Sequence, residues 1–337
     1  MKKSIILLFL LIFINGYSEE LKSFKEKRIV FKIVPVAVAA DAENNIYIAD
    51  RFTMSILKYN SKKEYLYSFG IKNIKKESLI FSPIDIFPVD NEIYVLDING
   101  GIYRFDYNGK YIGGVKYNRG KLRGESFGAR AIFVSDYIYL VDTNNSRIQI
   151  IKRDGMPYKE FGFYGTYDGQ FVYPEGITVR NNEIIVSDTG TNRVDKFDKN
   201  GFYQNSVYDK NKKFLRPTGI FSDESGHLYV LDSGNAQLKV FDKKDRLIYF
   251  IDFKIKNKKV KMEINDIWVQ NGLIYVSDTL NKNIKIYDKD MKYKGEIGKG
   301  SDVMMAIKMM SIFLVVIIMI LLLKKEKKMR RENSDGE

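Results

Sequence analysis

The sequence contains no cysteine and a single histidine, His227, among its 337 residues. Without cysteine the chain has no disulfides, no thiolate nucleophile and no thiolate metal ligand. One histidine cannot assemble a His-rich zinc site. The scarcity of both residue types argues against the usual nucleophile–base pairs of enzymes.

Proline is also scarce, with 6 residues, whereas Tyr and Phe are abundant, with 23 and 22. This balance favours β-strands. The glycines fall at turns and form no nucleotide-binding motif. The net charge of +13 is partly concentrated at the two ends. The moderate basic excess that remains in between permits an anionic partner without requiring one.

A short apolar segment that ends in Asp recurs along most of the chain. Its six copies end 44 to 47 residues apart and are IYIAD (Ile46–Asp50), IYVLD (Ile93–Asp97), IYLVD (Ile138–Asp142), IIVSD (Ile184–Asp188), LYVLD (Leu228–Asp232) and IYVSD (Ile274–Asp278). A fixed period of this size, with several short strands in each repeat, indicates the blades of a propeller. The sequence therefore predicts an all-β, six-bladed β-propeller.

The fourth copy, Phe161–Gly201, is the most complete: FGFYGTYDGQFVYPEGITVRNNEIIVSDTGTNRVDKFDKNG. Its pattern resembles the NHL repeat, which builds six-bladed propellers, and similar copies cover roughly residues 34–298. The resemblance implies a fold but no activity, because propellers host unrelated functions. Within this copy we expect four strands, at Gly176–Val179, Ile184–Asp188, Arg193–Asp198 and inside Phe202–Tyr208.

The N-terminal segment carries two lysines, the apolar run Ile5–Ile14 and small residues up to Ser18. This pattern predicts a signal peptide over residues 1–18, with an uncleaved anchor as the alternative. The segment Arg28–Val34 reads as a strand that could close the ring by joining the last blade. Lys294–Gly298 is the other candidate for that outer strand, and the sequence leaves the choice open.

Residues 303–323 predict a transmembrane helix, because Ala306–Leu323 is apolar except for one lysine near its start. The basic residues of 324–337 predict a cytoplasmic tail. The propeller, residues 19–300, would then lie outside the cytoplasm, in the periplasm or at the cell surface. The expected protein is a single-pass protein of the cell membrane.

The Asp that ends each copy is the most regular polar feature of the sequence. Asp favours turns because its carboxylate accepts hydrogen bonds from nearby backbone N–H groups. Its presence at one position in all copies favours an architectural role over catalysis. Arg147 and Arg193 each follow their Asp by five residues, which predicts an ion pair with that Asp inside the blade.

Aligning the copies on their first strand gives a second, irregular set of polar residues. Asp85, Arg130, Glu175, Asn265 and Asp266 fall where the strands would meet the mouth of the central channel. Convergent polar groups at a pocket suggest ligand binding. The alternative is a channel plugged by ion pairs of Arg130 with Asp85 and Glu175. If a metal binds, we expect calcium on Asp85, Glu175 and Asp266, because hard cations prefer oxygen ligands; no other cofactor is expected.

The loops between the copies supply further candidate contact residues. These are Arg119, Arg123, Tyr164, Tyr167, Lys256 and Lys258. Basic and aromatic residues together can bind nucleic acid, but the exported topology makes that partner unlikely, and a solvated charged rim is the plainer reading. Near a bilayer, these loops would face anionic lipid headgroups.

The sequence thus predicts a non-catalytic binding or scaffold propeller, tethered to the membrane, with one loop face presented to a protein, a peptide or an envelope glycan. The NHL-like amidating lyases depend on a His-liganded zinc, and this chain departs from them in having one histidine. The alternative is a calcium-dependent hydrolase or lyase that uses the channel carboxylates. Stabilisation by calcium would separate the two.

Overall fold

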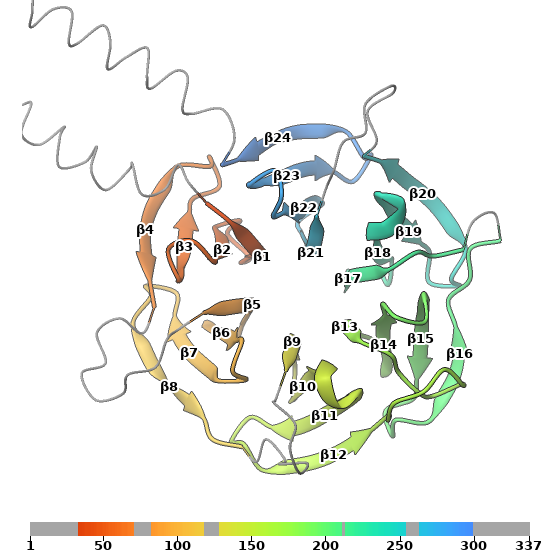
Figure 1. The fold of residues 1–337 in the computed structure, drawn as a ribbon. Coiled ribbons are helices and arrows are strands. Elements are labelled where there is room, and N and C mark those ends of the chain that lie inside the picture. Colours follow the sequence, from red (N-terminus) through yellow and green to blue (C-terminus); the bar gives the residue numbers. More distant parts are fainter. Residues whose placement is uncertain (1–32, 71–81, 118–127, 211–212, 254–262, 299–337) are drawn as a thin grey trace, which may run out of the picture. The chain divides into compact units, whose positions relative to one another are not determined.

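The structure is a computed structural model that describes residues 33–70, 82–117, 128–210, 213–253 and 263–298. These residues form six antiparallel sheets of four strands each, arranged as blades around a central axis (Figure 1). The predicted six-bladed all-β propeller is therefore confirmed.

Each blade is built from four consecutive strands, the first innermost and the fourth outermost. Blade 1 consists of β1 (Pro35–Ala40), β2 (Ile46–Asp50), β3 (Ser55–Tyr59) and β4 (Tyr65–Phe69), and blade 2 of β5 (Pro83–Val89), β6 (Glu92–Asp97), β7 (Ile102–Asp106) and β8 (Tyr111–Val115). Blade 3 consists of β9 (Ala129–Val134), β10 (Tyr137–Asp142), β11 (Arg147–Lys152) and β12 (Pro157–Phe161), and blade 4 of β13 (Pro174–Arg180), β14 (Glu183–Asp188), β15 (Arg193–Phe197) and β16 (Tyr203–Ser206). Blade 5 consists of β17 (Pro217–Ser222), β18 (Leu228–Asp232), β19 (Gln237–Phe241) and β20 (Leu247–Asp252), and blade 6 of β21 (Ile264–Gln270), β22 (Leu273–Asp278), β23 (Asn283–Asp288) and β24 (Tyr293–Ile297). Short 3₁₀ turns, η2 (Thr143–Asn145) and η3 (Ser233–Asn235), follow the second strands of blades 3 and 5.

The second strand of each blade is nearly continuously buried, whereas the outer strands are not. All five residues of β2 and of β18 are buried, but β4 alternates between half-buried and exposed positions. A middle strand has a neighbouring blade on both faces, so both sets of side chains must be apolar. The run of apolar residues in each repeated segment is thus a consequence of blade packing.

The hydrophobic core is divided into layers between adjacent blades. Five clusters of buried side chains each combine residues of neighbouring blades. Between blades 3 and 4, for example, Val141 and Ile150 share a cluster with Ile177 and Val186. Every blade is therefore stabilised by its neighbours, as expected for a repeat architecture.

In the residues described, blade 6 takes all four of its strands from the C-terminal end of the repeats, with β24 outermost. Of the two candidates for closing the ring, the segment Lys294–Gly298 supplies this strand. Side chains join blade 6 to blade 1: the Val38 N–H donates to Asp266 Oδ2 at 2.9 Å. The Thr279 hydroxyl donates to the Pro35 carbonyl at 2.6 Å.

The segments expected to be a signal peptide (1–18), a transmembrane helix (303–323) and a cytoplasmic tail (324–337) lie outside the described residues, so these remain predictions. Within the described ranges, no element is a helix with the length and apolarity needed to cross a bilayer.

Candidate functional site

The Asp that ends the second strand is buried in all six blades, with an exposed fraction of 1% or less. In blades 1, 4, 5 and 6 it binds the chain that enters the same blade: Asp188, for example, accepts from the Val172 N–H at 2.9 Å, and Asp232 accepts from the Leu215 N–H at 2.7 Å. Burial raises the pKa of Asp188 to about 6. In these blades the contacts orient the loop that leads into the inner strand, which is an architectural role.

The two arginines predicted to pair with this Asp behave differently. Arg147 Nε lies 2.9 Å from Asp142 Oδ2, so that ion pair is present. Arg193 instead pairs with Asp195 at 3.0 Å and donates to the carbonyl oxygens of Thr166, Tyr167 and Gln170. For Arg193 the prediction was wrong, because the adjacent loop offers three carbonyl oxygens to its guanidinium.

A β-bulge lies at the start of every inner strand, where the strand meets the channel mouth. In blade 3 the pairing jumps from Ala129↔Asp142 to Ala131↔Val141, which leaves Arg130 outside the register. In blade 4 it jumps across Glu175 in the same way. A bulge bends the strand and re-aims a side chain. Four of the five irregular positions singled out in the sequence are thus residues that the bulges release from the ladder: Arg130, Glu175, Asn265 and Asp266. In blade 2 the released residue is Ile84, and Asp85 stays paired with Leu96.

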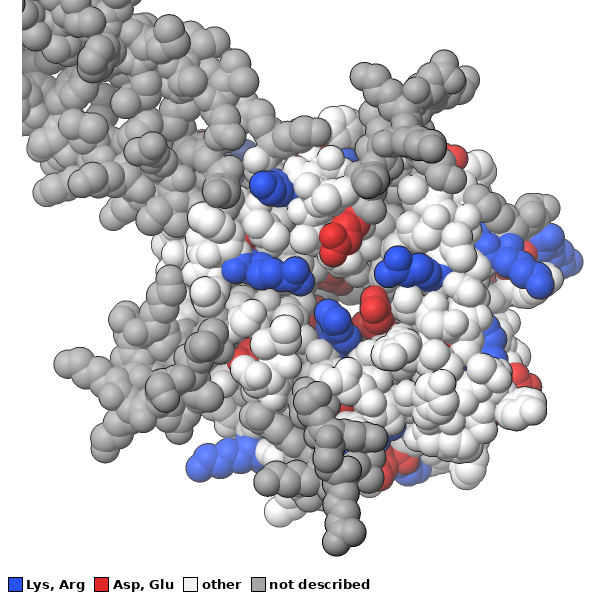
Figure 2. Space-filling view, viewed as in Figure 1, with Lys and Arg blue, Asp and Glu red and all other residues white. Residues whose placement is uncertain are grey.

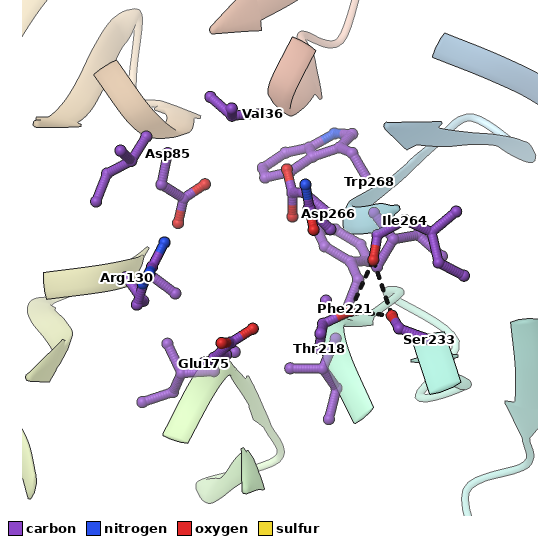
Figure 3. A pocket seen from close by; sticks show the side chains of 18 of the residues that line it. Val36, Asp85, Arg130, Glu175, Thr218, Phe221, Ser233, Ile264, Asp266 and Trp268 are labelled. Atoms are coloured by element: carbon purple, nitrogen blue, oxygen red, sulfur yellow. Dashed lines mark hydrogen bonds between the residues drawn. The ribbon is translucent and has the colours of Figure 1, made fainter. Parts of the chain in front are cut away.

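These bulges surround a cavity of about 700 Å³ at the centre of the ring, seen from close by in Figure 3. All five predicted residues line it: Asp85, Arg130, Glu175, Asn265 and Asp266. They come from blades 2, 3, 4 and 6. Their convergence is a feature of the structure, whereas their binding of a ligand remains a prediction.

Arg130 does not plug the channel by ion pairing. Among the residues described, Arg130 and Glu175 form no ion pair and no side-chain hydrogen bond. Burial raises the pKa of Glu175, and the positive charges of Arg130 and Arg216 partly oppose that rise. Both side chains are therefore free to meet a ligand.

Asp85 and Asp266 point toward each other across the channel (Figure 3) and connect adjacent blades. Asp85 Oδ2 accepts from the Ile132 N–H of blade 3 at 2.7 Å, and Asp266 Oδ2 accepts from the Val38 N–H of blade 1. Burial raises both pKa values, and the negative charge of Asp266 raises that of Asp85 further. Both carboxylates thus hold neighbouring inner strands together and favour the uncharged form.

Two cavity residues, Arg51 and Arg216, were missed by the sequence reasoning. Arg51 directly follows the Asp of the first copy, where four later copies have Ser or Thr. Arg216 directly precedes the Pro of the fifth copy. Both arginines would have been found by aligning the copies on the residue after this Asp and on the residue before this Pro, in addition to the first strand. Figure 2 shows basic and acidic side chains around the central opening.

Aromatic residues form the inner end of the cavity. Trp268 lies edge-on to Phe87 with ring centroids 5.1 Å apart, and it lies 4.7 Å from Phe221. Phe133 joins them at 4.9 Å from Phe87. All four rings line the cavity, and each follows the bulge of its own strand. The cavity therefore has a polar mouth and an aromatic floor.

The predicted calcium ligands Asp85, Glu175 and Asp266 do not come together as a set. Within the described part of the chain, no group of three or more His, Cys, Asp or Glu side chains is arranged to hold a metal ion. Asp85 and Asp266 are both engaged by backbone N–H groups of the neighbouring blades.

The loop residues fall into two groups. Tyr164 and Tyr167 are exposed, by 74% and 78%, on the loop between β12 and β13. Arg119, Arg123, Lys256 and Lys258 lie outside the described residues.

The fold and the central cavity define a six-bladed β-propeller with a ligand-sized opening on its axis. The NHL repeat family model matches residues 171–197 and 214–241, in blades 4 and 5. With the six-bladed arrangement, these matches support an NHL-repeat propeller, as the sequence predicted.

Curated relatives match parts of the chain. Protein brain tumor of Drosophila melanogaster is 26% identical over 130 residues, 35% of this chain and 12% of that protein. A probable peptidyl-alpha-hydroxyglycine alpha-amidating lyase of Caenorhabditis elegans is 32% identical over 116 residues, 31% of each protein. The chain thus spans less than a third of the length of these relatives.

Solved structures share the fold. A streptogramin B lyase superposes with a TM-score of 0.57 at 15% identity, covering 80% of this chain and 85% of that one. Virginiamycin B lyase from Staphylococcus aureus, in a structure with quinupristin, gives a TM-score of 0.55 at 14% identity, covering 80% of this chain and 86% of that one. At this identity the likeness concerns the fold alone.

Proposed function

We propose that this protein is a non-catalytic binding propeller that presents its channel-mouth face to a protein or peptide partner. The observation that carries this proposal is the loop between β12 and β13, which is ordered by its own hydrogen bonds yet exposes its aromatic side chains. The exposed fractions of Tyr164, Tyr167 and Tyr173 are 74%, 78% and 60%.

The loop is ordered by backbone hydrogen bonds within it and by the guanidinium group of Arg193. The Gly165 N–H donates to the Phe171 carbonyl at 3.1 Å, and the Phe171 N–H donates to the Phe163 carbonyl at 2.9 Å. The Arg193 guanidinium binds three further loop carbonyls from below. A preorganised loop loses little entropy on binding, and exposed tyrosines are typical anchors of protein interfaces.

The loop ends at the cavity, since Tyr173 lies two residues before Glu175. The loop between β12 and β13 and the cavity thus form one continuous surface to which a partner can bind. The propeller would be tethered by the segment 303–323 and lie outside the cytoplasm, with anionic headgroups nearby. The hydrophobic runs and the basic tail of the sequence support that location.

In-cell crosslinking of the tagged full chain, followed by mass spectrometry, tests this proposal. We expect near-stoichiometric recovery of one protein, reduced at least tenfold by a Tyr164→Ser/Tyr167→Ser variant. Tyr249→Ser is the matched control, because Tyr249 is exposed on the outer strand β20. Equal recovery of the partner by wild type, the double variant and the control would contradict a protein-binding face. Recovery of no specific protein would also contradict it, and an envelope glycan would then be tested as the ligand.

A further inference from the structure

We infer that the central cavity binds the compact anionic group of a ligand, a carboxylate or a phosphate, through Arg51, Arg130 and Arg216, with an apolar body of that ligand reaching the aromatic floor. This inference rests on the proposed function and names the chemistry that the channel mouth recognises.

The three arginines come from alternating blades, 1, 3 and 5, and line one cavity. All three residues are exposed. Within the residues described, none of their guanidinium groups has a hydrogen bond or an ion pair, although elsewhere on the propeller Arg147, Arg153, Arg180 and Arg193 are all paired. Arginine is the side chain best suited to oxyanions, because its planar fork can donate two parallel hydrogen bonds.

The local backbone conformation places the arginine side chains at the cavity. Arg130 is released from the ladder by the bulge of blade 3. Arg216 adopts a positive φ of 50°, and its backbone N–H is held by Asn192 Oδ1 at 2.7 Å. Non-glycine residues rarely adopt this conformation, and such residues cluster at functional sites. The fold thus accepts a backbone cost to place this side chain at the cavity.

The other charges of the cavity oppose the arginines only in part. Glu175 and Glu263 also line the cavity, and neither forms an ion pair with these arginines in the described residues, although the charges of Arg130 and Arg216 act on the Glu175 carboxylate. The deeper carboxylates of Asp85 and Asp266 are engaged with backbone N–H groups, and burial favours their uncharged form. An incoming anion therefore meets three arginines that have no ion-pair partner among the described residues, with the Glu175 carboxylate beside them.

The depth of the cavity indicates what chemical group the ligand would carry besides its anionic end. Asp85 precedes Phe87, and Asp266 precedes Trp268, by two residues on one face of each strand. At ~3.3 Å per residue, the rings lie roughly 7 Å below the carboxylates. A ligand that spans mouth and floor would carry its anionic group at one end and an aromatic or aliphatic group at the other.

Two probes of one shape test this inference on the full chain purified in detergent. N-acetylphenylalanine carries a carboxylate and an aromatic ring, and N-acetylphenylalanine amide lacks only the charge. By isothermal titration calorimetry we expect the acid to bind and the amide to bind at least tenfold more weakly. Arg130→Gln and Arg216→Gln should each weaken binding of the acid about tenfold, the loss expected for one charge-assisted hydrogen bond.

The matched control is Arg246→Gln, which removes the same charge at an exposed site outside the cavity and should leave acid binding unchanged. Inorganic phosphate is the second probe: competition with the acid would show that the site accepts either oxyanion. Equal affinity for acid and amide, wild-type affinity of the arginine variants, or an equal loss in Arg246→Gln would overturn the inference.

The crosslinking experiment separates this inference from the proposed function. A protein partner captured equally well by wild type and by Arg130→Gln/Arg216→Gln would overturn the inference and leave the binding propeller intact. Binding of the acid without any captured protein would support the anion site and overturn the protein partner.

Discussion

At the scale of single residues, the channel carboxylates are placed by backbone hydrogen bonds and not by cations. Asp266 accepts from the Val38 N–H of the next blade, and no Lys or Arg among the described residues pairs with it. Burial raises its pKa from 3.8 to about 7. Between these two pH values folding therefore takes up a proton at Asp266. The protonated carboxyl group contributes stability to the fold, and this contribution is lost as pH rises from 3.8 toward about 7.

Asp266→Asn should remove this pH dependence while keeping an oxygen for the Val38 N–H. We expect the melting temperature of the variant, relative to wild type, to be higher at pH 8 than at pH 5 by about 2–4 °C, the shift that ~1 kcal/mol causes in a domain of this size. Thermal denaturation of the full chain measures it. Asp290→Asn, at an exposed turn, is the control and should show no such difference. An equal shift at both pH values for Asp266→Asn would refute the argument.

At the scale of elements, the inner strands are joined by a few side-chain hydrogen bonds that repeat around the ring. The residue after the Asp that ends the second strand donates to the carbonyl of the next inner strand: Thr143 to Pro174, and Thr189 to Pro217, both at 2.6 Å. Close contact supplements these bonds, since a Cβ on Gly176 would lie 2.4 Å from the Thr218 carbonyl oxygen. Where the blades approach this closely, only glycine fits.

Thr189→Val tests these bonds, because it removes the hydroxyl and keeps the shape of the side chain. The Pro217 carbonyl would be left buried and unpaired, which costs about 1–3 kcal/mol. Urea denaturation of the full chain should show a lower midpoint. Thr166→Val, on the exposed loop surface, is the control and should change the midpoint little. Matching midpoints for Thr189→Val and wild type would contradict this role.

At the scale of the whole molecule, the proposed function depends on the predicted membrane topology. The exported propeller and cytoplasmic tail are predicted from the sequence alone, by the apolar runs near both ends and by the basic residues after Leu323. Such a topology would place the proposed anion-binding face where it meets envelope components.

The absence of cysteine allows a direct test of this topology with single-cysteine variants. We expect Ser61→Cys, in an exposed turn of blade 1, to react with a membrane-impermeant maleimide in intact right-side-out vesicles. Ser334→Cys, in the tail, should react only after the vesicles are permeabilised, because the bilayer would shield it. The reverse pattern, or equal labelling of both sites before permeabilisation, would rule out the predicted orientation.

The architecture of this protein could be predicted from its amino-acid sequence. Six apolar segments ending in Asp, 44 to 47 residues apart, indicate blades packed on both faces, and even Glu175 and Arg130 could be assigned to the channel by counting along the repeats. Such features are local or periodic, so they can be read from one chain.

The interactions of the channel residues could not be predicted from the sequence and follow from the folded ring. Arg51 and Arg216 join Arg130 in one cavity although they occupy different positions in their repeats, and Arg193 binds a loop instead of its own Asp. The reason is geometric: ring closure brings together residues from different blades, and the partner of a long side chain depends on distances that repeat spacing does not contain. The unpaired arginines, which carry the anion-binding proposal, emerge at that level alone.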